Sequence, residues 1–253
     1  MEISRRFLAM AAVASTICLA PPAGAAVPVA FGSSWDGPSY GLQALVNALY
    51  GAGRINVATD YLGARPGDPD PWFWVDHEVS SLLVREVAGN ASRNTVGWYE
   101  ETYAPPIIDG VGDGVIFDGP SGEGAEAVVT FDRPMTRFGF WLDPNGALDA
   151  PNAPQPERFF TNRHYNDRGP DGSGALHAPW DGDVQALVFD ISHIKGVPNT
   201  WLVCFEDLDS GPHPAPCCTG TDNDFNDVLF EVHAFGATPA RPLSLADLKR
   251  RYR

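Results

Sequence analysis

The residues best suited to chemistry gather near the C-terminal end of the chain, between two apolar segments. Residues 200–207 and 227–235 are apolar runs in which every second side chain shares one face, the period-two pattern of half-buried β-strands. Carboxylates and one amide lie where these segments meet the loop between them. In chain order they are Glu206, Asp207, Asp209, Asp222, Asp224, Asn226 and Asp227.

So many acidic groups in one loop favour a bound cation. Carboxylates held a few ångströms apart repel one another and raise each other's pKa. A hard cation with flexible oxygen coordination, calcium above all, relieves that repulsion. The acidic residues therefore predict a structural calcium site, and the alternative is a solvated acidic turn.

Two motifs in the chain resemble one family. Phe205-Glu-Asp-Leu208 followed by Asp222-Asn-Asp-Phe-Asn-Asp-Val-Leu-Phe230 is similar to its F-E-D-L and D-x-D-[FY]-N-D-[VL]-x-F pattern, and residues 87–99 are similar to a second segment of it. The family is an uncharacterised bacterial exoprotein domain that occurs in PEP-CTERM-sorted proteins and RTX-type adhesins. The resemblance covers residues 80–235 and implies a secreted, β-rich, calcium-associated domain without established catalytic activity.

Catalytic signatures are missing from the sequence. Neither a Gly-x-Ser-x-Gly elbow nor a His-Glu-x-x-His zinc motif is present, and no Gly-rich segment has the Lys of a phosphate-binding loop. A non-catalytic binding or adhesion module is therefore the expected function. The alternative is a secreted polysaccharide hydrolase that uses paired carboxylates, with Trp72 and Trp74 as a sugar-stacking platform.

The cysteines suggest a disulfide close to the acidic residues. Cys204 lies in the first segment, and Cys217 and Cys218 lie in the loop that follows it. A bridge from Cys204 to Cys217 or to Cys218 would close this loop and stabilise it by about 3 kcal/mol. A vicinal Cys217–Cys218 pair and a thiolate zinc site that includes His213 are the alternatives.

Export is indicated by the first 25 residues. Arg5 and Arg6, an apolar stretch and Ala23-Gly-Ala25 have the order of a signal peptide. Its removal takes away two arginines and Glu2, which changes the net charge from −15 to −16. A chain this acidic is repelled by nucleic acid and by anionic lipid. We expect a secreted or periplasmic protein without stable membrane insertion, whose partner is an extracellular glycan or a surface protein.

The elements that must position the acidic residues are mostly strands. One helix is expected over residues 37–50, with Ser39 as its N-cap, Gly51 at its end, and an apolar face made of Leu42, Leu45, Val46 and Leu49. Short strands separated by turns predict an all-β fold, an antiparallel β-sandwich or jelly roll with one short N-terminal helix. The expected strands are 79–88, 95–103, 115–118, 125–132, 136–142, 157–165, 184–191, 200–207 and 227–235.

The faces of these strands predict the core. The side chains expected to point inward are Phe138, Phe140, Leu142, Leu187, Phe189, Ile191, Trp201, Val203, Phe205, Val228, Phe230 and Val232. The chain is expected to divide into a signal peptide (1–25), an arm and helix packed on the sandwich (26–75), the sandwich itself (76–236) and a C-terminal tail (237–253).

Overall fold

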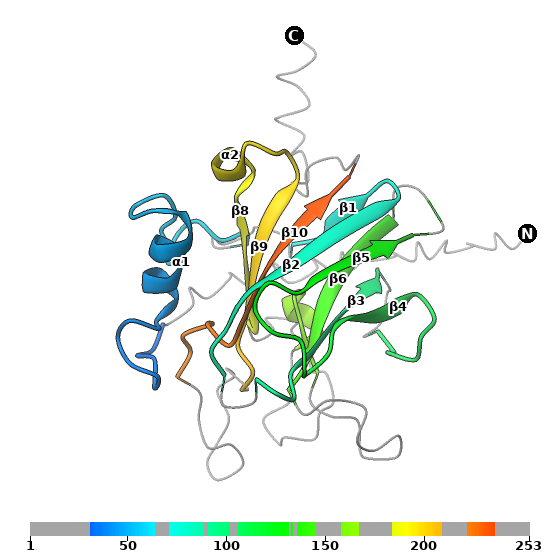
Figure 1. The fold of residues 1–253 in the computed structure, drawn as a ribbon. Coiled ribbons are helices and arrows are strands. Elements are labelled where there is room, and N and C mark those ends of the chain that lie inside the picture. Colours follow the sequence, from blue (N-terminus) through cyan, green and yellow to red (C-terminus); the bar gives the residue numbers. More distant parts are fainter. Residues whose placement is uncertain are drawn as a thin grey trace, which may run out of the picture.

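Two antiparallel β-sheets packed face to face form the body of the molecule in the computed structural model (Figure 1). The structure describes residues 31–63, 71–88, 91–101, 106–131, 133, 136–144, 158–166, 184–208 and 222–235. Its strands are β1 (Phe73–Val75), β2 (Glu78–Glu86), β3 (Thr95–Glu100), β4 (Asp113–Phe117), β5 (Glu126–Thr130), β6 (Thr136–Asp143), β7 (Phe159–Phe160), β8 (Ala186–Asp190), β9 (Thr200–Phe205) and β10 (Val228–Ala234). Its helices are α1 (Leu42–Tyr50), α2 (Ser192–Lys195) and the 3-10 turn Arg163–Tyr165.

The first sheet, here called the β10 sheet, has the strand order β5-β2-β10-β9-β8. Its central strand is β10, which pairs antiparallel with β9 on one side and with β2 on the other. The second sheet, the β6 sheet, has the order β1-β6-β3-β4, and β7 adds to β6. Every pairing is antiparallel, as the all-β prediction required.

Alternating side chains from both sheets fill the space between them. Trp201, Val203 and Phe205 of β9 join Phe138 and Phe140 of β6 in one buried cluster. The cluster also contains Leu142, Val228, Phe230 and Val232. Aromatic rings meet edge to face across this interface, as the centroids of Phe140 and Phe230 do at 5.2 Å. The predicted core faces of β6, β9 and β10 are thereby confirmed.

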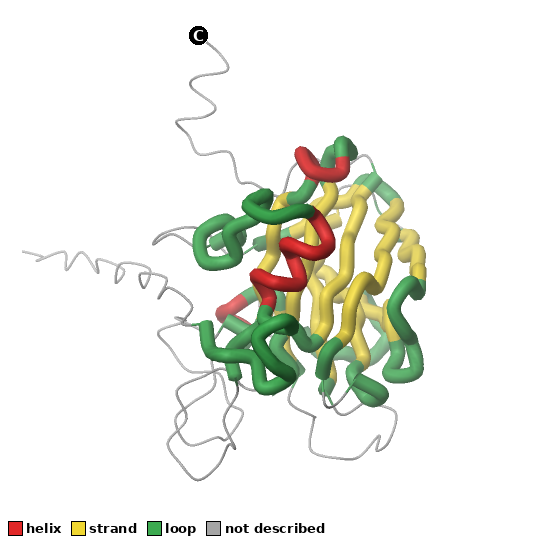
Figure 2. The backbone as a smooth tube through the Cα atoms, turned by 60° about the vertical axis from the view of Figure 1, so that its left-hand side comes forward, coloured by secondary structure: helices red, strands yellow, loops and turns green. Residues whose placement is uncertain are grey.

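The outer face of the β10 sheet is also apolar, and α1 covers it (Figure 2). Leu42, Leu45 and Val46 of the helix are buried there, together with Leu202 and Cys204 of β9. The same cluster contains Leu187, Phe189 and Ile191, so the expectation that these three residues face the inter-sheet core was wrong. Both faces of β8 and β9 are apolar because both are buried: the β6 sheet covers the inner face and α1 covers the outer face.

The ends of α1 differ in part from the prediction. Gly41, not Ser39, occupies the N-cap position, and no side chain caps the helix. Gly51 ends the helix as expected, with a positive φ of 96° that favours glycine, and its N–H donates to the carbonyl of Asn47. Leu49 is 41% exposed, so it does not belong to the packed face.

Polar contacts fasten the end of α1 to the β10 sheet. The Tyr50 hydroxyl donates to Glu231 Oε1 at 2.9 Å, and Lys195 of α2 forms an ion pair with the same carboxylate at 2.9 Å. Burial and the neighbouring Glu231 raise the pKa of Tyr50, which keeps its hydroxyl a donor. The helix is thus attached to β10, the strand that leads out of the acidic loop.

The observed strands agree with those expected from the sequence to within a few residues, except that 157–165 contains only the two-residue β7. Strand β1 was not expected, and it places the start of the sandwich at Phe73, before the predicted boundary at residue 76. The short α2 was also not expected. Among the described residues, no helix is long and apolar enough to cross a membrane.

Candidate metal centre

Strand register brings the acidic residues together at one end of the β10 sheet. Val228 of β10 lies opposite Phe205 of β9 on one side and opposite Glu86 of β2 on the other. The residues that follow Phe205 and the residue that precedes Val228 must therefore meet at the same end of the sheet. The pairing of β9 with β10 therefore brings together residues that lie more than twenty positions apart in the sequence.

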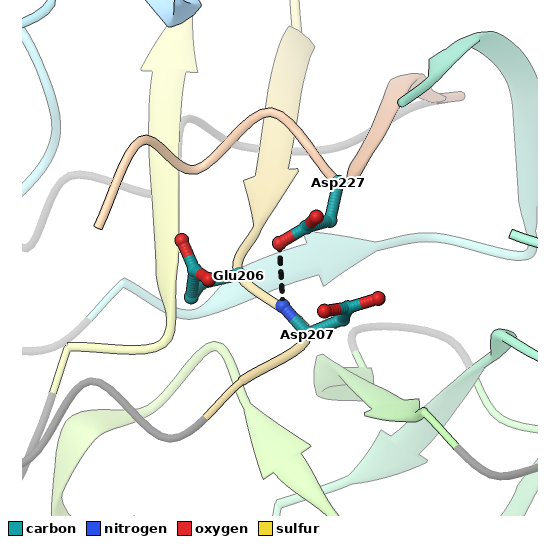
Figure 3. Close-up of side chains that lie close together, drawn as sticks. All are labelled: Glu206, Asp207 and Asp227. Carbon is teal, nitrogen blue, oxygen red and sulfur yellow. Dashed lines mark hydrogen bonds between the residues drawn. The ribbon is translucent and has the colours of Figure 1, made fainter. Parts of the chain in front are cut away.

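Three buried carboxylates form the centre of this cluster (Figure 3). Glu206, Asp207 and Asp227 each place a carboxylate oxygen within 4.8 Å of the others. Their exposed fractions are 0%, 4% and 8%. The backbone N–H of Asp207 donates to Asp227 Oδ2 at 2.7 Å, which holds the end of β9 against the start of β10.

The electrostatics of these three carboxylates favour either protonation of one of them or a bound cation. The pKa of Asp227 lies well above its ordinary value, first because of burial and then because of repulsion from Glu206 and Asp207. The hydrogen bond from the Asp207 N–H acts in the opposite direction. A cation among these oxygens would replace the repulsion by attraction, so the group has the chemistry of a site for a hard metal ion.

Glu206 also belongs to a second group, with Asp222 and Asp224. The N–H of Phe225 donates to Glu206 Oε2 at 3.2 Å, so the carboxylate of Glu206 lies against the loop that precedes β10. Burial raises the pKa of Asp224 to about 6; a hydrogen bond with Ser34 lowers it and the charge of Asp222 raises it. The carboxylates predicted from sequence thus lie in two groups that share one residue.

Two residues of this loop adopt a backbone conformation that is uncommon outside glycine. Asn223 has φ 49° and Phe225 has φ 55°. Asparagine tolerates this left-handed region, whereas phenylalanine rarely adopts it. Phe225 is fully buried in the cluster under α1 and packs edge to face with Phe31, with 5.8 Å between ring centroids. This packing holds the loop in its turn-like path above the carboxylates.

Asn226 connects the acidic loop to the segment before α1. Its side-chain amide donates to the carbonyl of Tyr40 at 2.7 Å, to Ser34 and to Asp224. It therefore ties the loop to the segment before α1 and contacts Asp224, a member of the second carboxylate group. Asp209, the seventh predicted ligand, lies outside the described residues.

The segment before α1 packs on the acidic loop. Gly32 N–H donates to the carbonyl of Asn223 at 3.1 Å, and the N–H of Trp35 donates to Asp222 Oδ2 at 2.7 Å. A Cβ atom on Gly32 would lie 1.7 Å from the Asp222 carbonyl oxygen, so only glycine allows this approach. The N-terminal arm is thereby part of the structure of the site.

Two residues that adjoin the cluster, Asn94 and Glu86, were not predicted from the sequence. Asn94 is 3% exposed, and its Nδ2 donates to Asp207 Oδ2 at 3.2 Å. Glu86, at the end of β2, has its pKa raised to about 7 by burial and by Asp207, while a hydrogen bond with Asn94 lowers it. Asn94 lies within residues 87–99, the second segment that resembles the family. This resemblance was the sequence feature that could have identified Asn94 as part of the site.

Cys204, the first cysteine of the predicted disulfide, is buried and is a free cysteine in the described part of the chain. Its side chain lies on the outer face of β9 in the cluster under α1, and burial raises the pKa of its thiol. Cys217, Cys218 and His213 lie outside the described residues, so the disulfide stays a prediction; the predicted signal peptide and the predicted C-terminal tail also lie outside them.

Trp72 and Trp74 lie far from the acidic cluster. They hold the guanidinium of Arg137 between them, 5.0 and 5.2 Å from their ring centroids. Phe73, the residue between them, contacts Trp201 with 5.3 Å between ring centroids, and Trp201 precedes Glu206 by most of β9. At ~3.3 Å per strand residue, the two tryptophans and the carboxylates are separated by roughly 16 Å along the sandwich.

Comparisons of the chain with family models, with curated proteins and with solved structures gave no match.

Proposed function

We propose that the chain is an exported, non-catalytic binding module whose β-sandwich is stabilised by calcium. The observation that carries the proposal is the burial of Glu206, Asp207 and Asp227 within 4.8 Å of one another. Calcium accepts carboxylate ligands in flexible geometry, and Glu206, Asp207 and Asp227 would hold it. Asp222 and Asp224 adjoin them through Glu206.

Calcium would act on stability by mass action. An ion that binds the folded chain and not the unfolded chain stabilises by about 2.7 kcal/mol at 100 times its Kd. In a protein of this size, this corresponds to a rise in Tm of about 5–10 °C. Outside the cell, where calcium is plentiful, the ion would hold the loop before β10 and the end of β9 in one arrangement.

The binding role rests on the signal-peptide pattern and on the resemblance to domains of secreted adhesins. An extracellular glycan or a surface protein is the proposed partner. The hydrolase alternative receives no specific support, because its carboxylates are buried and its proposed sugar platform, Trp72 and Trp74, holds Arg137 at the other end of the sandwich.

The first experiment compares the wild-type chain with Asp227→Asn, by calcium titration calorimetry and by thermal unfolding with calcium and with chelator. Asparagine keeps an acceptor for the Asp207 N–H but removes a buried negative charge. We expect the variant to melt higher than wild type in chelator and to lose most of the calcium-induced rise. Release of reducing sugar from polysaccharides, measured on the same samples, tests for hydrolysis.

The matched control is Asp113→Asn. Asp113 is a buried aspartate at the start of β4, and its carboxylate accepts hydrogen bonds from the N–H groups of Asp109 and Gly110. This substitution should lower Tm equally in calcium and in chelator. If wild-type Tm does not depend on calcium, the proposed role of the acidic cluster is wrong. Retention of the protein on immobilised glycans and bacterial surface proteins then tests the binding role separately.

A further inference from the structure

Asn94 and the carboxylate cluster come from different sheets. Asn94 directly precedes β3 of the β6 sheet, whereas Glu206 and Asp207 follow β9 of the β10 sheet. The Asn94 amide nevertheless reaches Asp207 Oδ2 at 3.2 Å. The cluster therefore lies at a place where a single ion can contact side chains of both sheets.

The amide of Asn94 is buried and only partly used. Its Nδ2 hydrogen-bonds to Asp207 and to Glu86. Its Oδ1 is buried, and none of the described residues donates a hydrogen bond to it. A buried carbonyl oxygen without a donor is unfavourable, and native structures seldom keep one unless another group satisfies it.

The structure directs Nδ2 toward Asp207, and a cation at the carboxylates would satisfy the oxygen once the amide is turned to face them. Amide carbonyl oxygens are regular calcium ligands alongside carboxylates. Rotation of the Asn94 amide by a half-turn about its last side-chain bond exchanges Nδ2 and Oδ1, and that bond has broad rotational freedom. A cation between the amide and Asp207 would replace the Nδ2 hydrogen bonds to Asp207 and Glu86, and the rotated amide would direct its oxygen to the same ion that the carboxylates hold.

We propose that Asn94 is an oxygen ligand of the cation bound by Glu206, Asp207 and Asp227, so that the ion joins the two sheets of the sandwich. This inference rests on the proposed function, because it presupposes that the cluster binds calcium. It adds a ligand from the β6 sheet to ligands from the β10 sheet. Calcium would then hold the sheets together at this end as well as ordering one loop.

The test separates a ligand from a hydrogen-bond donor. Asn94→Ala removes both functions, whereas Asn94→Asp keeps an oxygen and, when ionised, removes the donor. We expect calcium titration to show at least a tenfold weaker Kd for Asn94→Ala. We expect Asn94→Asp to bind calcium as tightly as wild type or more tightly, and to melt lower than wild type in chelator because it adds a negative charge beside Glu86 and Asp207.

A control comes from Asn162, another buried asparagine, whose amide donates to the carbonyl of Pro71 at 3.0 Å. Asn162→Ala should lower Tm without changing the calcium Kd. Circular dichroism checks that each variant is folded. If Asn94→Ala is not folded, Asn94→Ser takes its place, because its shorter side chain also lacks the amide group.

The outcomes distinguish this inference from the proposed function. Equal loss of affinity in Asn94→Asp and Asn94→Ala would mean that Asn94 acts as a donor to Asp207, which overturns the inference alone. Unchanged affinity in Asn94→Ala would also overturn it alone. Absence of calcium binding by the wild-type chain would overturn the proposed function and this inference with it.

Discussion

At the scale of single residues, burial makes the acidic side chains sensitive to pH. Burial raises the pKa of Glu86 from 4.5 to about 7 and that of Asp224 from 3.8 to about 6. The folded chain therefore holds these protons more tightly than the unfolded chain does. Their contribution to stability is fully present below the unfolded pKa values and is lost as the pH rises through the folded ones.

In excess chelator, we accordingly expect the free energy of unfolding to fall as the pH rises from about 4.5 to about 7. Urea unfolding at several pH values across this window measures the slope. Glu86→Gln should flatten it, because this variant no longer titrates there. With saturating calcium the trend should reverse, since the ion requires ionised carboxylates. A calcium-free protein that gains stability over the same window would contradict this account of Glu86 and Asp224.

Residue types alone located the carboxylates but not all of their neighbours. Glu206, Asp207 and Asp227 could be grouped from sequence because two alternating segments flank them and pair as a hairpin-like unit. Glu86 and Asn94 could not, because their approach depends on the pairing of β2 with β10 and on how the two sheets pack. Alternation within a strand does not reveal its pairing partner or its register.

At the scale of elements, β3 and β6 depend on a glycine. Gly97 of β3 lies directly opposite Trp141 of β6. A Cβ atom at Gly97 would lie 2.2 Å from the Trp141 ring and 2.3 Å from the carbonyl oxygen of Gly114 on β4. The strand is therefore held between a bulky ring and a neighbouring backbone, and neither can move without disturbing the β6 sheet.

We expect Gly97→Ala to destabilise the protein by about 1–3 kcal/mol or more, because it overfills a packed site. Gly122→Ala is the matched control, since a Cβ atom there meets no atom within 4 Å. That control should stay within about 0.5 kcal/mol of wild type. Urea unfolding of the three proteins measures the difference. Equal stability of Gly97→Ala and Gly122→Ala would show that β3 and β6 adjust more freely than their contacts indicate.

Prediction of the side chains that lie between the sheets succeeded for β6 and failed for β8. Phe138, Phe140 and Leu142 were placed correctly between the sheets. Leu187 and Phe189 were not, because β8 has apolar residues on both faces and its sequence does not say which one the helix covers.

At the scale of the whole molecule, the protein has three layers, with α1 on the β10 sheet and that sheet on the β6 sheet (Figure 2). The contact between the first two layers depends on buried leucines. Leu42→Ala, at a residue 2% exposed, should cost about 2–5 kcal/mol. Leu49→Ala, on the same helix but 41% exposed, should cost about 1 kcal/mol or less. Urea unfolding provides both values.

Reactivity of the Cys204 thiol reports separately on whether this layer is in place, because the thiol lies beneath α1 and burial raises its pKa. In a chain with serine at its other cysteines, labelling of Cys204 should be faster with Leu42→Ala than with Leu49→Ala. Equal labelling rates would mean that Leu42 does not hold the helix on the sheet.

The position of β10 in its sheet also governs the order in which the molecule can assemble. β10 is the last strand of the described chain, yet it lies in the middle of its sheet, between β2 and β9. Until it is synthesised, those two strands have no partner between them, and neither the sheet nor the carboxylate cluster at its end can close. A nascent chain therefore has to wait for β10, a late segment of the sequence, before this sheet can form, so its assembly depends on contacts between residues far apart in the chain.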